Sequence, residues 1–163
     1  MLRRAYDGVV RALVFVAFSV MLGAALAGTV SRYLPFLPTI AWGEEVTRYA
    51  GIWSVFLVSG LGLRYGAHLG VDMLTSRLPA GARRLVYLIV HALILAFILL
   101  LLVAGIRLVR ENVGQLSPAL EWSMGWVYLC IPIGAGLMLV EVLGLLGRAL
   151  RGLPPPGPAA EDA

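Results

Sequence analysis

The sequence predicts an all-α membrane protein with four transmembrane helices. Hydrophobic residues make up 60% of its 163 residues, only 13% are charged, and the mean hydropathy is +0.90. The apolar residues gather in four long runs instead of recurring at amphipathic spacing. A bilayer core of about 30 Å needs about 20 helical residues at a rise of about 1.5 Å each. We therefore expect spans at about 10–31, 41–64, 85–107 and 119–147.

The first two spans differ in how well their apolar runs fill the bilayer. The run 12–30 carries no charge and is long enough by itself. Its basic start and the small residues 25–27 also resemble a cleavable signal peptide, but the run exceeds the usual hydrophobic region of such a leader. The second run, 49–63, is long enough only if its helix begins near Ile40 and includes charged residues.

The third run, 85–106, and the fourth, 122–146, fill the bilayer unaided. Ser117 followed by Pro118 has the form of an N-cap with proline at the first helical position, so we expect the fourth helix to start there. Pro132 lies inside that helix and predicts a kink.

The charges indicate the orientation of the spans. All 13 basic residues are arginine, and the net charge is +4. Nine lie in the N-terminal segment, the middle connection and the tail, three lie in the other two connections, and one lies inside the second span. By the positive-inside rule, both termini and the middle connection are cytoplasmic. Arginines that flank spans, with no aromatic–basic pattern, disfavour nucleic-acid binding.

We expect one membrane domain over residues 1–152, followed by a disordered proline-rich tail over 153–163. Cys130 is the only cysteine, so an intrachain disulfide is excluded.

Three charged residues open the second span and are called the acidic cluster: Glu44, Glu45 and Arg48. At i,i+4 and i,i+3 spacing in a helix, one guanidinium can reach both carboxylates. The pattern is typical of an ion-pair cap on the positive end of the helix dipole. It also fits a docking contact to a partner subunit, because one arginine does not neutralise two glutamates. A coupling-ion or proton site is the third alternative.

A second polar group follows the same span and is called the polar row: Arg64, His68 and Asp72. Their spacing by four places them on one helix face, among apolar residues. This pattern predicts a short amphipathic segment along the inner membrane surface that ends at Pro79. It would serve as a surface linker or as a polar bridge to another subunit, and one His with one Asp is too few ligands for a metal site.

His91 and Glu141 are ionisable residues inside the third and fourth spans. Such residues are functional candidates by default. Both lie near an interface, where snorkelling or a local pair lowers the cost, so we expect a local structural role. His68 and His91 lie at different depths and do not form a haem site, so no cofactor is expected.

These residues resemble a known family, the small membrane subunit of tripartite ATP-independent periplasmic (TRAP) transporters, over roughly residues 9–150. The motifs that carry the resemblance are Trp42-Gly-Glu44-Glu45-Val-Thr-Arg48, Trp53, Arg64-x3-His68-Leu-Gly-Val71-Asp72-x-Leu74, Ser117-Pro-Ala-Leu, Trp126-Val-Tyr128 and Ile131-Pro132-Ile-Gly134. His91 is not part of the pattern and takes no role from it.

The resemblance implies a multi-pass protein of a bacterial or archaeal inner membrane. It implies a non-catalytic small permease subunit that scaffolds a large multispanning subunit, which holds the sodium and substrate sites. An extracytoplasmic binding protein would deliver an organic acid. By the match of positions, Trp42 and the acidic cluster are candidates for contact with either partner. The polar row is the candidate for a cytoplasmic-side anchor.

Two other functions are alternatives to this one. A self-sufficient, homodimeric, proton-coupled exporter would use Glu141, the deepest carboxylate in a span. A membrane enzyme or electron carrier is disfavoured, because the sequence offers no nucleophile–base pair and no metal-ligand cluster.

Overall fold

The computed structural model describes residues 2–34, 40–75 and 79–151, with the side chains of 2–4, 64–75, 80 and 149 left out of the description. This part of the chain forms α1 (Leu2–Tyr33), α2 (Gly43–Thr75), α3 (Ala80–Asn112), α4 (Met124–Tyr128) and α5 (Cys130–Leu150). Within it, four stretches are long and apolar enough to cross a membrane: Ala5–Tyr33, Gly43–Leu63, Gly81–Asn112 and Met124–Arg148. The predicted all-α class with four spans is confirmed. The predicted tail lies outside the described residues.

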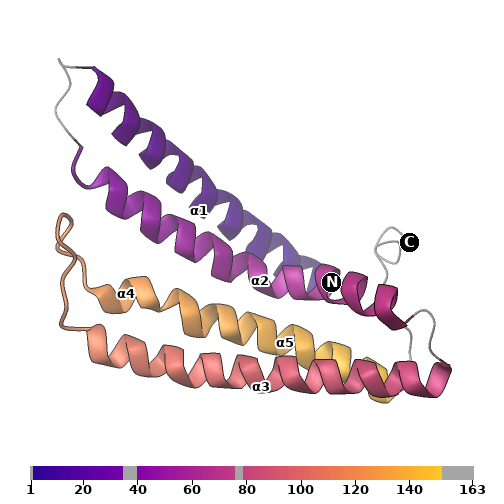
Figure 1. Cartoon of the computed structure of the whole chain (residues 1–163). Coiled ribbons are helices and arrows are strands. Elements are labelled where there is room, and N and C mark those ends of the chain that lie inside the picture. The colour runs from indigo at the N-terminus through magenta and orange to yellow at the C-terminus, as the bar shows by residue number, and fades with distance from the viewer. Residues whose placement is uncertain (1, 35–39, 76–78, 152–163) are drawn as a thin grey trace.

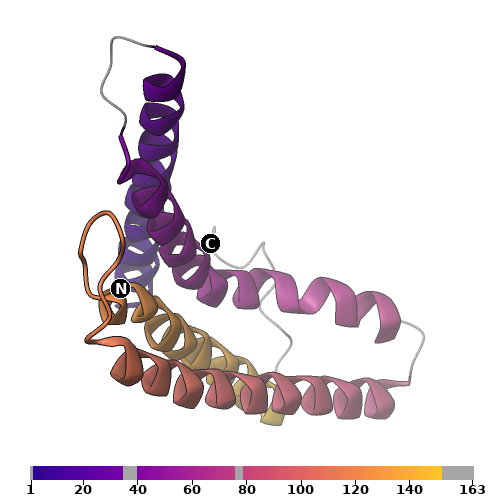
Figure 2. The same ribbon diagram turned by 60° about the vertical axis from the view of Figure 1, so that its left-hand side comes forward.

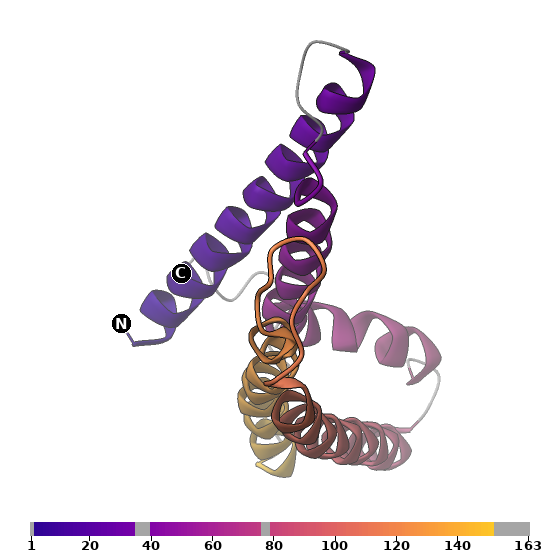
Figure 3. The ribbon, with the colours of Figure 1, turned by 90° about the vertical axis from the view of Figure 1, so that its left-hand side faces the viewer.

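The helices form an open layer instead of a closed bundle (Figure 1). α1 runs antiparallel to α2, α2 packs on α5, and α5 runs antiparallel to α3, which gives the order α1–α2–α5–α3. Figure 3 shows α1 and α3 at opposite edges of this order. Only 11% of the most apolar window is buried in each of these edge helices, against 28% and 33% in the middle two. Most of the surface of α1 and α3 is therefore left for lipid or another protein.

The two chain ends of the layer lie together. The Leu2 end of α1 and the Leu150 end of α5 lie at one end, and the other end is where α1 joins α2 and α3 joins α4 (Figure 1). We call the latter the connection end. This geometry fits termini on one side of the membrane, and the assignment of that side to the cytoplasm stays a prediction.

α2 is longer than its membrane span and changes direction along its length (Figure 2). The apolar stretch ends at Leu63, but the helix continues to Thr75. The predicted amphipathic segment falls in this continuation. Its backbone is helical as far as Thr75, residues 76–78 lie outside the described residues, and its position on the membrane surface stays a prediction.

The predicted helix start at Ser117-Pro118 is wrong, because α4 begins at Met124. The residues before it form a narrow hairpin instead. The N–H of Ser117 donates to the Trp122 carbonyl at 2.8 Å, and the N–H of Met124 donates to the Gln115 carbonyl at 2.8 Å. The Ser117 hydroxyl accepts the N–H of Trp122 at 3.2 Å, so it closes the hairpin instead of capping a helix.

The fourth span is interrupted at Leu129, between α4 and α5. Pro132 follows closely. Its missing N–H and its ring disturb the helix at the carbonyl one turn earlier, that of Tyr128. The helix assignment therefore breaks close to Pro132, while Leu129 keeps a right-handed helical backbone, and the predicted kink stays a prediction.

The middle of the layer depends on close contact between α2 and α5. A Cβ added to Gly134 would lie 2.7 Å from the carbonyl oxygen of Phe56, and one added to Gly60 would lie 3.1 Å from the Cβ of Leu137. Small residues at helix contacts allow this approach in membranes, where association depends on van der Waals packing. On the other side of α5, Ala135 packs in a buried cluster with Ile98 of α3.

We expect Gly134→Ala to loosen the contact of α2 with α5, because the new methyl group overlaps backbone that cannot move aside. The cost of such overpacking is about 1–3 kcal/mol. Thermal unfolding of the purified protein in detergent should show a lower Tm. Gly136→Ala is the matched control, since nothing lies within 4 Å of its added Cβ. Equal Tm values for the two variants would contradict this account of the packing.

Candidate functional site

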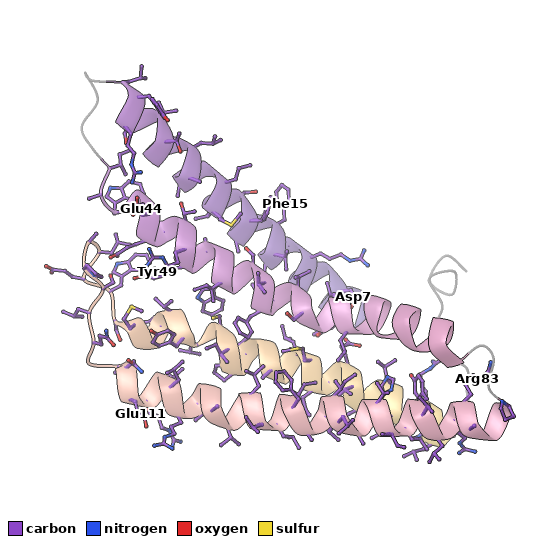
Figure 4. All side chains as sticks on the ribbon, viewed as in Figure 1. Asp7, Phe15, Glu44, Tyr49, Arg83 and Glu111 are labelled. Carbon is purple, nitrogen blue, oxygen red and sulfur yellow. The ribbon has the colours of Figure 1, made fainter. Side chains whose placement is uncertain are left out.

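The acidic cluster lies at the connection end, on the first turn of α2, as the position of Glu44 in Figure 4 shows. Glu45 is only 8% exposed. Its carboxylate accepts the backbone N–H of Ala119 at 2.8 Å and that of Leu120 at 3.1 Å. Charge-assisted bonds of this kind are among the stronger hydrogen bonds in proteins. Glu45 therefore fastens the α3–α4 hairpin to the start of α2.

Glu44 has a different partner. Its carboxylate forms an ion pair with Arg32 at the end of α1, and both side chains are exposed, by 62% and 61%. An exposed pair of this kind contributes little to stability. The expectation that Arg48 bridges both carboxylates is therefore wrong. Arg48 is exposed and acts on Glu45 only through its nearby charge, with no hydrogen bond or ion pair among the described residues.

Two aromatic side chains flank the cluster. Trp42 precedes α2 and is 46% exposed. Tyr49, one turn after Glu45, is buried and directs its hydroxyl to the Met124 sulfur at 3.6 Å. Figure 4 shows Tyr49 on the side of α2 that faces the hairpin and α4. The start of α2 thus contacts the α3–α4 segment both through Glu45 and through Tyr49.

The polar row lies in the second half of α2, where the structure describes the backbone alone. The helix runs unbroken through these positions to Thr75, so the spacing by four places them along one side of it. The side chains of Arg64, His68 and Asp72 lie outside the description, and their role as an anchor stays a prediction.

His91 and Glu141 are both buried, at 0% and 3% exposure. The His91 ring stacks on Tyr87 with centroids 3.9 Å apart, and its Nδ1 lies 2.8 Å from the carbonyl oxygen of Tyr87. A carbonyl can only accept, so Nδ1 carries the proton. His91 thus has a partner one turn earlier in its own helix and is enclosed by protein, and its local structural role stays a prediction.

Sequence reasoning missed the partners of both glutamates. In the sequence Arg32 counted only as one of the basic residues in a connection. Its positive charge, opposite to that of Glu44, was a usable signal of the ion pair. Ala119 and Leu120 contribute backbone N–H groups. Every residue except proline has such a group, so the residue type does not show which ones bind Glu45.

We expect Glu45→Ala to free the amides of Ala119 and Leu120. Without the carboxylate these N–H groups lose a charge-assisted bond, and their hydrogen exchange should accelerate by about tenfold or more. Hydrogen–deuterium exchange with mass spectrometry of peptides covering 115–123 measures the effect. Glu44→Ala is the control and should leave those peptides unchanged. Equal exchange in all three proteins would show that Glu45 does not hold the hairpin.

Fold and site together define a class, a four-span membrane protein whose charged residues gather at its ends. In the part of the chain that is described, no group of three or more His, Cys, Asp or Glu residues could hold a metal ion. The profile of the family described as tripartite ATP-independent periplasmic transporters, DctQ component, matches residues 21–152. The match covers well over half of the chain, and the protein belongs to this family.

Individual relatives agree with this assignment. The chain is similar to the C4-dicarboxylate TRAP transporter small permease protein DctQ of Rhodobacter capsulatus, 31% identical over 64% of this chain and 47% of the relative. The same-named protein of Vibrio cholerae is 33% identical over 77% of this chain and 64% of its own length. The isethionate TRAP transporter permease protein DctMQ of Oleidesulfovibrio alaskensis is 29% identical over 68% of this chain and 18% of its own length. The chain thus spans about half of the first relative and a small part of the third.

These findings confirm the resemblance stated from the motifs. The protein belongs to the TRAP small-subunit family, and with its four apolar helices it is a multi-pass protein of the bacterial inner membrane.

Proposed function

We propose that this chain is the non-catalytic scaffold of its transporter. It supports a large membrane subunit that moves an organic acid into the cell together with sodium ions. An extracytoplasmic binding protein delivers the acid. The C4-dicarboxylate and isethionate transporters among the relatives support an organic acid as the substrate class.

The observation that carries this proposal is the open layer. α1 and α3 lie at its edges with most of their apolar surface unburied, so the layer offers broad lateral faces to a neighbour. A layer with such edges suits a subunit that widens its partner. The DctMQ relative adds support. The segment that matches this protein is only 18% of that permease, so in the relative a similar segment is joined to a much larger protein in one chain.

In this proposal the residues of the acidic cluster have two different roles. Glu45 acts within the subunit, because its carboxylate is used by the hairpin. Trp42, Glu44 and Arg48 are exposed and are the proposed contacts to the binding protein or the large subunit. A hollow of about 390 Å³ beside them is lined in part by Arg32, Glu44 and Arg48 and could receive a partner's side chain. The polar row is the proposed anchor at the opposite end.

We expect the purified chain alone, in proteoliposomes, to move no solute under a sodium gradient. Uptake of a C4-dicarboxylate or another organic acid should appear only when the large subunit and the binding protein are both added. Radiolabelled substrate measures uptake, and vesicles with the large subunit and no small subunit are the control. Transport by the small chain alone would contradict the scaffold function and would favour the exporter alternative at Glu141.

We expect Arg48→Glu to slow uptake by the complete transporter by about tenfold, because reversing an exposed contact charge lowers the association rate and changes its salt dependence. Arg110→Glu is the matched control, since Arg110 is an exposed arginine near the connection end of α3. Initial uptake rates at two ionic strengths measure the effect. The same rate in both variants would mean that no partner contacts Arg48.

A further inference from the structure

A groove of about 960 Å³ opens between α1, α2 and the segment 121–127. Its volume is at the upper end of the range for ligand pockets, about 300–1,000 Å³. The walls are almost entirely apolar and include Val16 and Val20 of α1, Trp53 and Leu57 of α2, and Trp126 and Val127 of α4. The helices of the layer do not fill this space themselves.

The length of the groove matches one leaflet of a bilayer. Along α2 its lining runs from Val46 near the connection end to Leu57, within the span Gly43–Leu63. At a rise of about 1.5 Å per residue this is about 16 Å, close to half of a hydrocarbon core of about 30 Å. A partner's transmembrane helix needs a contact along the whole core. An acyl chain of one leaflet needs about half of it.

The charge at the mouth of the groove selects a headgroup. Among the described residues that line the groove, Glu121 alone is charged, and it is exposed. Trp122 and Trp126 lie in the same lining and are 56% and 71% exposed. A carboxylate and indole rings together attract an ammonium group. The described lining contains no arginine, so a purely anionic headgroup would find no cation among these residues.

We propose that the groove binds one phospholipid whose headgroup carries an ammonium, such as phosphatidylethanolamine, from the leaflet at the connection end. One of its two acyl chains lies against α1 and α2, and its ammonium lies at Glu121 beside the two tryptophans. The lipid fills the space between α1 and α4 and so supports the edge helix α1. This inference concerns a bound lipid and does not depend on which solute the transporter carries.

Native mass spectrometry of the full-length chain, purified with its membrane partner in mild detergent, tests the proposal. Equal amounts of phosphatidylethanolamine and phosphatidylglycerol with the same acyl chains are added before measurement. We expect one retained phosphatidylethanolamine in preference to phosphatidylglycerol. Ala17→Trp fills the groove and should abolish this retention, because Ala17 is part of the lining. Ala12→Trp is the matched control on the same helix, exposed and outside the lining, and should retain the lipid.

The headgroup contact is tested at the mouth of the groove, without filling its apolar part. Glu121→Gln should lower the preference for phosphatidylethanolamine by about two- to fivefold, the effect of one exposed charge pair. Glu121→Lys should reverse the preference. Because Glu121 is exposed, both of its variants should fold, so they test the proposal even if Ala17→Trp does not fold.

Three results would overturn the proposal. The first is equal lipid retention in Ala17→Trp and in the unaltered protein. The second is equal binding of the two lipids by the unaltered protein. The third is loss of the membrane partner from Ala17→Trp when the unaltered complex carries no lipid, which would make the occupant a protein segment. Uptake by the reconstituted transporter is a separate readout, so the scaffold function stands or fails independently.

Discussion

The absence of water from the hydrocarbon core of the membrane governs this structure. Every backbone N–H and carbonyl group there must be paired within the protein, which requires helices for the spans. Apolar side chains gain little from leaving lipid, so the layer has no need to close around a core. α1 and α3 therefore stay at the edges with their apolar faces uncovered. The contacts that do form are tight ones, as at Gly134 against Phe56.

Polar interactions join segments that helix packing does not bring into contact, and the most important of them is made by Glu45. Its carboxylate joins the start of α2 to backbone amides of the α3–α4 hairpin, far along the chain. Two neighbouring glutamates thereby take different roles, since Glu44 remains exposed with Arg32. The same hairpin carries Glu121 and Trp122 to the mouth of the apolar groove. Glu45 thus connects the internal architecture with both proposed contact surfaces.

The sequence was sufficient for the fold class, because the number of spans follows from the apolar runs. Each run can be recognised without knowing which helices pack against it. The ordered motifs that begin at Trp42, Arg64 and Ser117, taken together with four spans, were sufficient for the family. Local spacing was misleading for Arg48, since the true partners of both carboxylates come from other segments. It also misplaced the start of α4, because Ser117-Pro118 has the form of an N-cap but Ser117 pairs with Trp122 across a hairpin. Contacts made by backbone amides or formed between distant helices need coordinates.

The central claim is that this subunit is a static support, and one measurement tests it directly. Spin labels at Phe15→Cys on α1 and Leu100→Cys on α3, both exposed positions, report the separation of the two edge helices by electron–electron double resonance. The labelled subunit is measured in the complete transporter with and without sodium and substrate. The account predicts one unchanged distance distribution. A shift on the order of one helical turn, about 5 Å, would contradict it and would make the small subunit a moving part of the transport cycle.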